Sequence, residues 1–140
     1  MIRIVLDANI IVSGFPAESG PLAQIIRLWA EEQFVVMASQ HIINEVETAW
    51  QKPYWQRRLP KHRIERALYT LQRRSKRVQI GDTAPKVASH RQDDLVIATA
   101  VKGGADYLVT GDKELRAVGQ HEGVKIRTPQ EFLEEFAGLG

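Results

Sequence analysis

Short apolar runs alternate along the chain with longer segments in which apolar residues recur every three or four positions. Residues 2–6 are almost continuously apolar and β-branched, which is typical of a central strand in a parallel sheet, where both faces are covered. Similar runs at residues 34–37, 78–80, 105–109 and 124–126 predict further strands. The pattern therefore predicts a sheet of about five strands.

Helical periodicity fills most of the segments between these strands, and a Gly/Pro/Ser loop follows the first one. Strands that alternate with helices predict a three-layer α/β/α sandwich around a mostly parallel central sheet. A chain of 140 residues, 44% of them hydrophobic, has the size of a single domain, and we expect one over residues 1–140. Helices are predicted at residues 20–33, 40–50, 60–75, 93–102, 113–118 and 129–136.

Composition excludes several classes of chemistry. The chain has no cysteine, so disulfides, thiolate catalysis and cysteine-based zinc sites are absent. The apolar run at residues 2–6 is too short for the core of a signal peptide, and no later stretch reaches membrane-spanning length. We therefore expect a cytoplasmic protein with no membrane partner.

Charge is distributed unevenly, although the net charge is only +2. Residues 52–91 contain 12 Lys and Arg against two Asp and Glu, whereas the rest of the chain contains 7 basic and 15 acidic residues. This distribution fits a protein that holds phosphates with one surface and divalent cations with another, and it fits a solvated charged surface equally well.

Four acidic residues occupy positions at which the predicted sheet would bring them together. Asp7 and Asp112 each follow a predicted strand, while Glu45 and Asp94 lie near the beginnings of helices that start from the same edge. Active sites of such sheets lie outside the carboxyl ends of the strands. We therefore expect the four carboxylates to converge at that edge.

Each carboxylate also has a purely structural alternative. Asp7 could cap the following loop, and Asp112 could cap the short helix that it precedes. Glu45 could be a solvated glutamate, although no Lys or Arg lies three or four residues away to form an ordinary helical salt bridge. For the tandem acids that begin the helix at 93–102, we assign the cap to Asp93 and the ligand role to Asp94.

A carboxylate set without a histidine-rich cluster is typical of a site for one or two hard cations, Mg²⁺ or Mn²⁺, and disfavours zinc. Such a site would serve phosphodiester hydrolysis, because the cation lowers the pKa of a bound water and stabilises charge on the phosphate. Asn9 could bond a water in that site or merely close the turn after Asp7.

The chain resembles the PIN-domain nucleases, in particular the toxin components of prokaryotic toxin–antitoxin pairs. The resemblance rests on residues 5–13, 39–53, 93–100 and 105–113, which together span almost the whole chain. Each stretch alone is a weak pattern, but the four in this order and spacing are specific for the fold. The resemblance implies a sandwich of Rossmann-type topology.

The resemblance also implies an activity and a set of site residues. The implied activity is that of a metal-dependent endoribonuclease that cuts single-stranded or structured RNA, is often a homodimer, and is often neutralised by an antitoxin protein. The implied acidic ligands are Asp7, Glu45, Asp94 and Asp112, and the supporting residues are Asn9, Thr110 and Asp93. At the tandem acids, a shift of one residue in the alignment would make Asp93 the ligand in place of Asp94.

Basic residues beside the acidic set would then hold the RNA backbone, with an affinity that falls with salt. Core packing explains Trp50 best, whereas Tyr54 and Trp55 could either pack or stack on bases. The predicted helix at 60–75 would pack against the core through one apolar stripe, and its arginines lie on an adjoining arc that faces outward. The predicted RNA-binding residues are Arg57, Arg58, Arg63, Arg66, Arg73 and Arg74.

Other functions remain compatible with the sequence. An Asp after a first strand also serves phosphoryl transfer through an aspartyl phosphate, but Asn9 stands where that chemistry needs a second carboxylate. A non-catalytic RNA- or partner-binding module would keep the arginines, and its basic groove could accept an acidic or extended peptide. A housekeeping RNA-processing nuclease would use the same site as a toxin.

Overall fold

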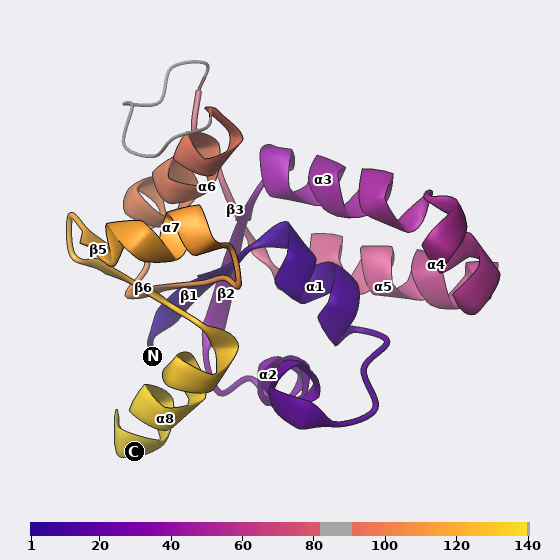
Figure 1. The fold of residues 1–140 in the computed structure, drawn as a ribbon, viewed down its shortest axis with the longest axis horizontal. Coiled ribbons are helices and arrows are strands. Elements are labelled where there is room, and N and C mark those ends of the chain that lie inside the picture. Colours follow the sequence, from indigo (N-terminus) through magenta and orange to yellow (C-terminus); the bar gives the residue numbers. More distant parts are fainter. Residues whose placement is uncertain (82–90, 140) are drawn as a thin grey trace.

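The computed structural model describes residues 1–81 and 91–139, and within them the chain forms a six-stranded sheet flanked by helices (Figure 1). The strand order is β3-β2-β1-β4-β6-β5, and only the β5–β6 pair is antiparallel. This confirms the predicted sandwich with a mostly parallel sheet. The strands are β1 (Arg3–Leu6), β2 (Val35–Ser39), β3 (Lys76–Val78), β4 (Tyr107–Val109), β5 (Gln120–His121) and β6 (Val124–Arg127).

The helices form the two outer layers. The chain moves from β1 to β2 and β3 in one direction and then crosses back to β4, so right-handed connections place the helix before β4 on the opposite face from the helices before β2 and β3. The helices are α1 (Ala8–Gly14), α2 (Gly20–Ala30), α3 (Gln40–Trp50), α4 (Pro53–Arg58), α5 (Lys61–Arg74), α6 (Arg91–Lys102), α7 (Lys113–Val118) and α8 (Pro129–Leu139).

Two helices, α1 and α4, and one strand, β5, were not predicted from the sequence. Residues 8–14, which precede and enter the predicted loop, form α1, and Pro53 begins α4 at a position where its missing N–H costs nothing. Both helices have two turns or fewer, so their apolar residues show no clear helical period. The strand predicted at 78–80 lies two residues earlier, because Lys76–Val78 is the segment that pairs with the end of β2.

The topology places the end of β1 at the point where strand order reverses. β1 pairs with β2 on one side and with β4 on the other, and Leu6 is in register with Val109. The backbone N–H of Asp7 continues this ladder by donating to the carbonyl of Val109 at 3.0 Å. In open parallel sheets the crevice outside such a switch point is where ligands bind.

Helix α3 is fixed at both ends, to α6 at its start and to α1 at its end. Ser39 caps α3 by accepting from the N–H of Ile42 and also accepts a buried hydrogen bond from Thr99 of α6 at 2.8 Å. At the other end, the indole N–H of Trp50 donates to the carbonyl of Val12 at 3.2 Å. Trp50 is 1% exposed, as expected for a core residue.

No helix in the two described ranges is both long and apolar enough to cross a membrane.

Candidate functional site

Asp7 lies at the carboxyl end of β1 and is 8% exposed. One carboxylate oxygen accepts from the N–H of Ala8 at 2.8 Å, which caps α1, and the other accepts from the hydroxyl of Thr110 at 2.7 Å. Burial raises the pKa of Asp7, and the carboxylates of Glu45 and Asp112 raise that pKa further, against the lowering effect of the two hydrogen bonds. The cap that was the structural alternative for Asp7 is therefore present, and two more carboxylates act on Asp7 through their charge.

Hydrogen bonds to Thr110 link Asp112 to Asp7. The Thr110 hydroxyl oxygen accepts from the N–H of Asp112 at 3.0 Å while its proton is donated to Asp7. The exposed Asp112 carboxylate caps α7 by accepting from the N–H groups of Glu114 and Leu115 at 2.8 and 3.2 Å. One oxygen accepts both capping bonds, and the other accepts no hydrogen bond from residues 1–81 or 91–139.

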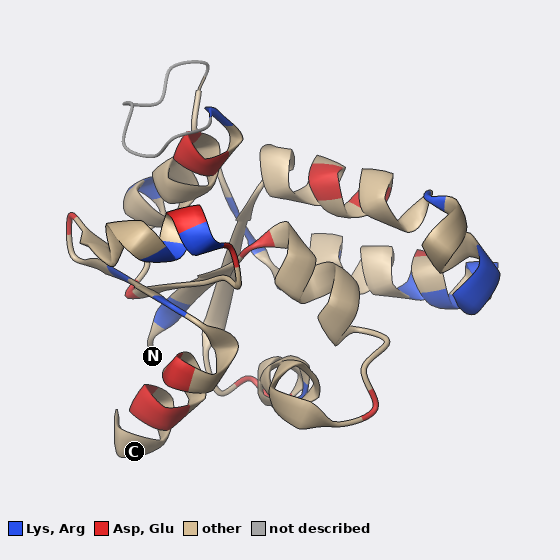
Figure 2. Cartoon of the chain, viewed as in Figure 1, with Lys and Arg blue, Asp and Glu red and all other residues tan. Residues whose placement is uncertain are grey.

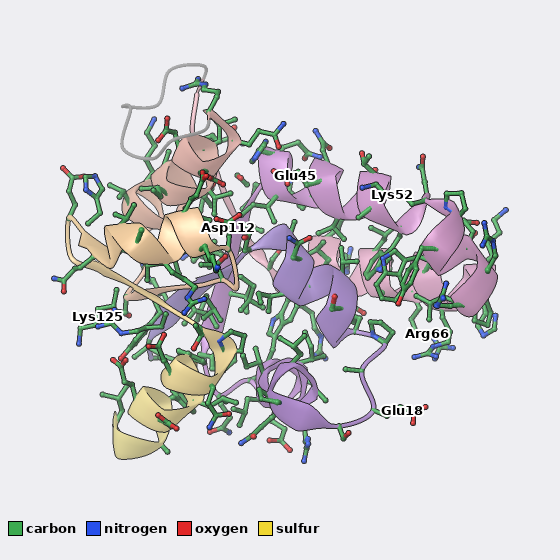
Figure 3. All side chains as sticks on the ribbon, in the orientation of Figure 1. Glu18, Glu45, Lys52, Arg66, Asp112 and Lys125 are labelled. Carbon is green, nitrogen blue, oxygen red and sulfur yellow. The ribbon has the colours of Figure 1, made fainter. Side chains whose placement is uncertain are left out.

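Glu45 has a neighbour on its own helix that the sequence analysis did not consider. The Nε2 atom of His41, four residues earlier on α3, lies in contact with the Oε1 atom of Glu45, and both atoms are buried. As expected, no Lys or Arg lies three or four residues away from Glu45. In Figure 3, Glu45 is labelled on α3 and Asp112 at the start of α7. We call Asp7, Glu45 and Asp112 the carboxylate edge.

The tandem acids lie in the first turn of α6. Because α6 begins at Arg91, the assignment of the helix cap to Asp93 was wrong. Asp94 is 4% exposed, whereas Asp93 is half-buried. Asp94 borders a small pocket of about 100 Å³ that is also lined by His121 and Glu122. The structure thus connects three of the four predicted ligands electrostatically and places the fourth at the start of a neighbouring helix.

Asn9 and Thr110, the two predicted supporting residues outside α6, differ in their surroundings. Thr110 is fully buried and joins Asp7 to Asp112. Asn9 is exposed in the first turn of α1 rather than closing a turn. Within residues 1–81 and 91–139, no three His, Cys, Asp or Glu side chains already form a metal-binding group. The carboxylate edge is therefore a set of carboxylates that influence one another through their charge, and it is not a formed metal-binding group.

The predicted arginine arc is divided between two places. Arg57, Arg58, Arg63 and Arg66 are exposed on α4 and the first half of α5. Figure 2 shows Lys and Arg concentrated at this end of the molecule, and in Figure 3 Arg66 and Lys52 lie there, away from Glu45 and Asp112. We call these four arginines the arginine end.

Arg73 and Arg74 lie elsewhere. They border a pocket with Met1, Trp29 and Phe34, near the beginnings of β1 and β2, and Arg74 donates to the carbonyl of Ala30 at 3.3 Å. That is the opposite edge of the sheet from Asp7. The arginines of α5 share one arc of the helix, as expected, but α5 extends about 16 Å between Arg63 and Arg74 at about 1.5 Å per residue, so the arc does not form one compact surface.

The sequence profile of the PIN domain matches residues 3–114. The chain belongs to the PIN-domain family. The match covers all three members of the carboxylate edge, together with Asp94 and the arginine end. Comparison with curated protein sequences gave no significant match.

Two solved structures share the fold. The structure of VapBC2 from Rickettsia felis, bound to a DNA fragment from its promoter, aligns with a TM-score of 0.61 and 12% identity over 91% of this chain and 98% of that one. The structure of VapC20 from Mycobacterium tuberculosis, a toxin that cleaves the sarcin–ricin loop, aligns with a TM-score of 0.54 and 21% identity over 85% and 97%.

Two features of this PIN domain were missed in the sequence, and each left a signal there. His41 stands four residues before Glu45, a spacing that places two side chains on the same helical face. Thr99 and Ser39 are hydroxyl residues inside apolar segments, where a buried hydroxyl needs a partner. Their pairing joins the beginning of α3 to the second half of α6, and these helices carry Glu45 and Asp94.

Proposed function

We propose that this PIN domain is a metal-dependent endoribonuclease that hydrolyses RNA phosphodiester bonds at the carboxylate edge. The observation that carries the proposal is the environment of Asp7, which is buried, has a raised pKa, and has two further carboxylates as neighbours. A carboxylate that serves only as a helix cap has no need of two like charges nearby, whereas a cation-binding carboxylate does.

The donor set fits a hard divalent cation. Asp7, Glu45 and Asp112 offer only oxygen atoms, and Mg²⁺ or Mn²⁺ is held in proteins by one or two carboxylates and several waters. Asp94, buried at the start of α6, would complete the set. When bound, one or two such ions would supply an activated water and stabilise negative charge on the phosphate.

The protein's own groups orient this set. Thr110 holds one oxygen of Asp7, and Ala8 holds the other, so the carboxylate cannot rotate. His41 contacts Glu45 from the same helix and fixes its direction. Ser39 and Thr99 keep α3 and α6 in register, and with them Glu45 and Asp94. Orientation of ligands by such surrounding groups is worth about 10- to 100-fold in metal affinity.

The arginine end would hold the RNA backbone. Its four guanidinium groups are exposed. Helix α4 carries no acidic residue, and the one acidic residue of α5, Glu65, lies 3.9 Å from Lys61. Contacts of this kind give affinity that depends strongly on salt and carries little sequence information. The RNA would extend from this end along α1 and α3 to the carboxylate edge.

We further infer that the protein is the toxin of a toxin–antitoxin pair, acts as a homodimer in the cytoplasm, and is neutralised by an antitoxin protein. This inference is supported by membership of the PIN-domain family and by the shared fold of VapBC2 and VapC20. A housekeeping RNA-processing nuclease is the alternative, and the presence of a small regulator gene beside this one would favour the toxin.

The test is cleavage of a labelled single-stranded RNA by the purified protein with Mg²⁺, with Mn²⁺ and with chelator. We expect cleavage that requires the cation and is lost in both Asp7→Asn and Asp94→Asn. Arg27→Gln, an exposed change on α2, is the matched control and should leave cleavage unchanged. RNA binding without cleavage, equal in all variants, would instead identify a non-catalytic binding module.

A further inference from the structure

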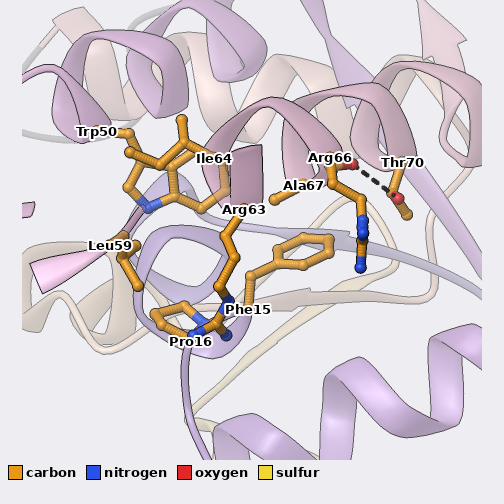
Figure 4. Close-up of a pocket in the computed structure, with 9 residues that line it drawn as sticks. All are labelled: Phe15, Pro16, Trp50, Leu59, Arg63, Ile64, Arg66, Ala67 and Thr70. Carbon is orange, nitrogen blue, oxygen red and sulfur yellow. Dashed lines mark hydrogen bonds between the residues drawn. The ribbon is translucent and has the colours of Figure 1, made fainter. Parts of the chain in front are cut away.

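A pocket of about 210 Å³ lies where α1, α3 and α4 end against α5 (Figure 4). Its apolar wall is formed by Phe15 after α1, Trp50 at the end of α3 and Leu59 after α4. Its polar wall is formed by α5, with Arg63, Arg66 and Thr70. At about 30 Å³ per water, this volume holds roughly seven waters, which is room for one planar ring system.

The apolar wall is fixed before any ligand enters. Phe15 meets the rings of Trp29 and Trp50 edge to face, at centroid distances of 5.8 and 6.0 Å. Trp50 is held in turn by its hydrogen bond to the carbonyl of Val12. A flat ligand would therefore enter between side chains that are already ordered, without the cost of ordering them on binding.

The polar wall selects for an anionic ligand that also carries hydrogen-bonding groups. None of the residues lining the pocket is acidic, and Arg63 and Arg66 are both exposed at its rim. The Thr70 hydroxyl donates its proton to the carbonyl of Arg66 at 3.0 Å, so its oxygen can still accept. The partly exposed ring of Phe15, a hydroxyl acceptor and guanidinium donors together match a nucleobase attached to phosphate.

From these features we infer that the pocket is a subsite for one unpaired nucleobase of the RNA. This inference rests on the proposed function and adds to it a preference for a base turned out of the strand. Phe15 lies about 12 Å from Asp7 along α1, at about 1.5 Å per residue. At about 3.4 Å per stacked nucleotide, the bound base lies at most about four nucleotides from the cleaved phosphate.

The shape favours a base over a partner peptide. A peptide bound as an added strand needs an open sheet edge, and the residues that line this pocket belong to helices and the residues that flank them. A peptide bound as a helix needs several anchoring pockets at successive turns. Here one compact pocket has basic residues at its rim.

The indole N–H of Trp50 reports binding in this pocket, because its ring forms part of the wall. The experiment follows that resonance by two-dimensional ¹H–¹⁵N NMR of the full chain in chelator, with Trp50→Phe used for assignment. The probes are the four nucleoside monophosphates, ribose 5-phosphate and an acidic peptide. We expect at least one nucleotide to shift the Trp50 resonance and to bind about tenfold more tightly than ribose 5-phosphate, the size of one base-stacking contact.

Matched variants assign the effect to the pocket. Arg63→Gln and Thr70→Val should weaken nucleotide binding several-fold, whereas Arg27→Gln should not change it. Equal binding of ribose 5-phosphate and the nucleotides would overturn the inference, as would a Trp50 shift with the peptide alone. If the protein cleaves RNA but no nucleotide moves Trp50, the subsite fails and the nuclease stands; if nucleotides bind but no RNA is cleaved, the nuclease fails and the subsite stands.

Discussion

The carboxylate edge and the arginine end lie near opposite ends of α1, and their charged groups differ in burial. At the carboxylate edge, Asp7 is buried and its pKa is raised by burial and by Glu45 and Asp112. At the arginine end the charges are exposed, and Arg58 stacks on Tyr54 at 3.6 Å and donates to the Tyr54 carbonyl at 2.8 Å.

The carboxylate edge should therefore destabilise the folded protein when no ligand is bound, whereas the arginine end should not. A buried carboxylate beside two others destabilises the folded protein until a cation or a proton arrives. Exposed arginines are solvated and cost little, whether or not a phosphate is bound. Removing charge should therefore raise stability at the carboxylate edge and have almost no effect on it at the arginine end.

The largest effect is expected from Asp7→Asn on catalysis. Loss of this ligand removes charge stabilisation worth several kcal/mol, so the rate of RNA cleavage should fall about a thousandfold or more. The measurement is the single-turnover rate at saturating Mn²⁺. A loss below about tenfold would show that Asp7 is only the cap of α1.

A smaller loss is expected from Thr110→Val, which keeps the shape of the side chain and removes the hydroxyl between Asp7 and Asp112. Asp7 should then be less well oriented, and Mn²⁺ affinity should fall about 10- to 100-fold by isothermal titration calorimetry. Thr48→Val, an exposed change on α3, is the matched control. Unchanged affinity in Thr110→Val would remove Thr110 from the site.

The two groups of arginines should differ in RNA binding. The double variant Arg63→Gln/Arg66→Gln should lose about tenfold in affinity and lower the salt-dependence slope by about 1.4, or about 0.7 for each lost phosphate contact. Arg73→Gln/Arg74→Gln should change neither quantity appreciably. Fluorescence anisotropy with a labelled RNA at several salt concentrations measures the affinity and the slope. Equal losses of affinity in the two double variants would show that both pairs of arginines bind RNA.

The smallest effect concerns stability without metal. Because the pKa of Asp7 lies above its ordinary value near 3.8, the folded protein holds that proton more tightly than the unfolded chain. The wild type should therefore lose stability as pH rises through that window, and Asp7→Asn should not show this loss. Denaturant unfolding in chelator between about pH 3.5 and 7 measures the difference. A variant less stable than the wild type at neutral pH would show that the cap outweighs the repulsion.

Much of the fold follows from local sequence patterns. The run at residues 2–6 identifies the central strand because a strand covered on both faces must be apolar on both. Once that strand is placed, Asp7 at its end lies at the switch point of the sheet, and Asp112 lies after the neighbouring strand. Local pattern therefore predicts where the carboxylates are, because the topology brings strand ends together.

The remaining features depend on contacts across the fold or on elements too short for a period. The helix α1 has seven residues, and its apolar stretch Ile10, Ile11 and Val12 shows no helical spacing. The separation of Arg63 from Arg74 depends on the length of α5, which a helical projection omits. The bond between Ser39 and Thr99 joins residues 60 positions apart, and no local pattern encodes such a distance.

The most direct test of the carboxylate edge is the position of a bound cation. Crystals of the protein grown with Mn²⁺ would locate the ion by its anomalous scattering. We predict an ion that is bound to Asp7 and lies between Glu45 and Asp112. The same ion should be absent from crystals of Asp7→Asn grown in the same way. An ion found only away from Asp7, or no ion at saturating Mn²⁺, would contradict the account of this edge as a metal centre.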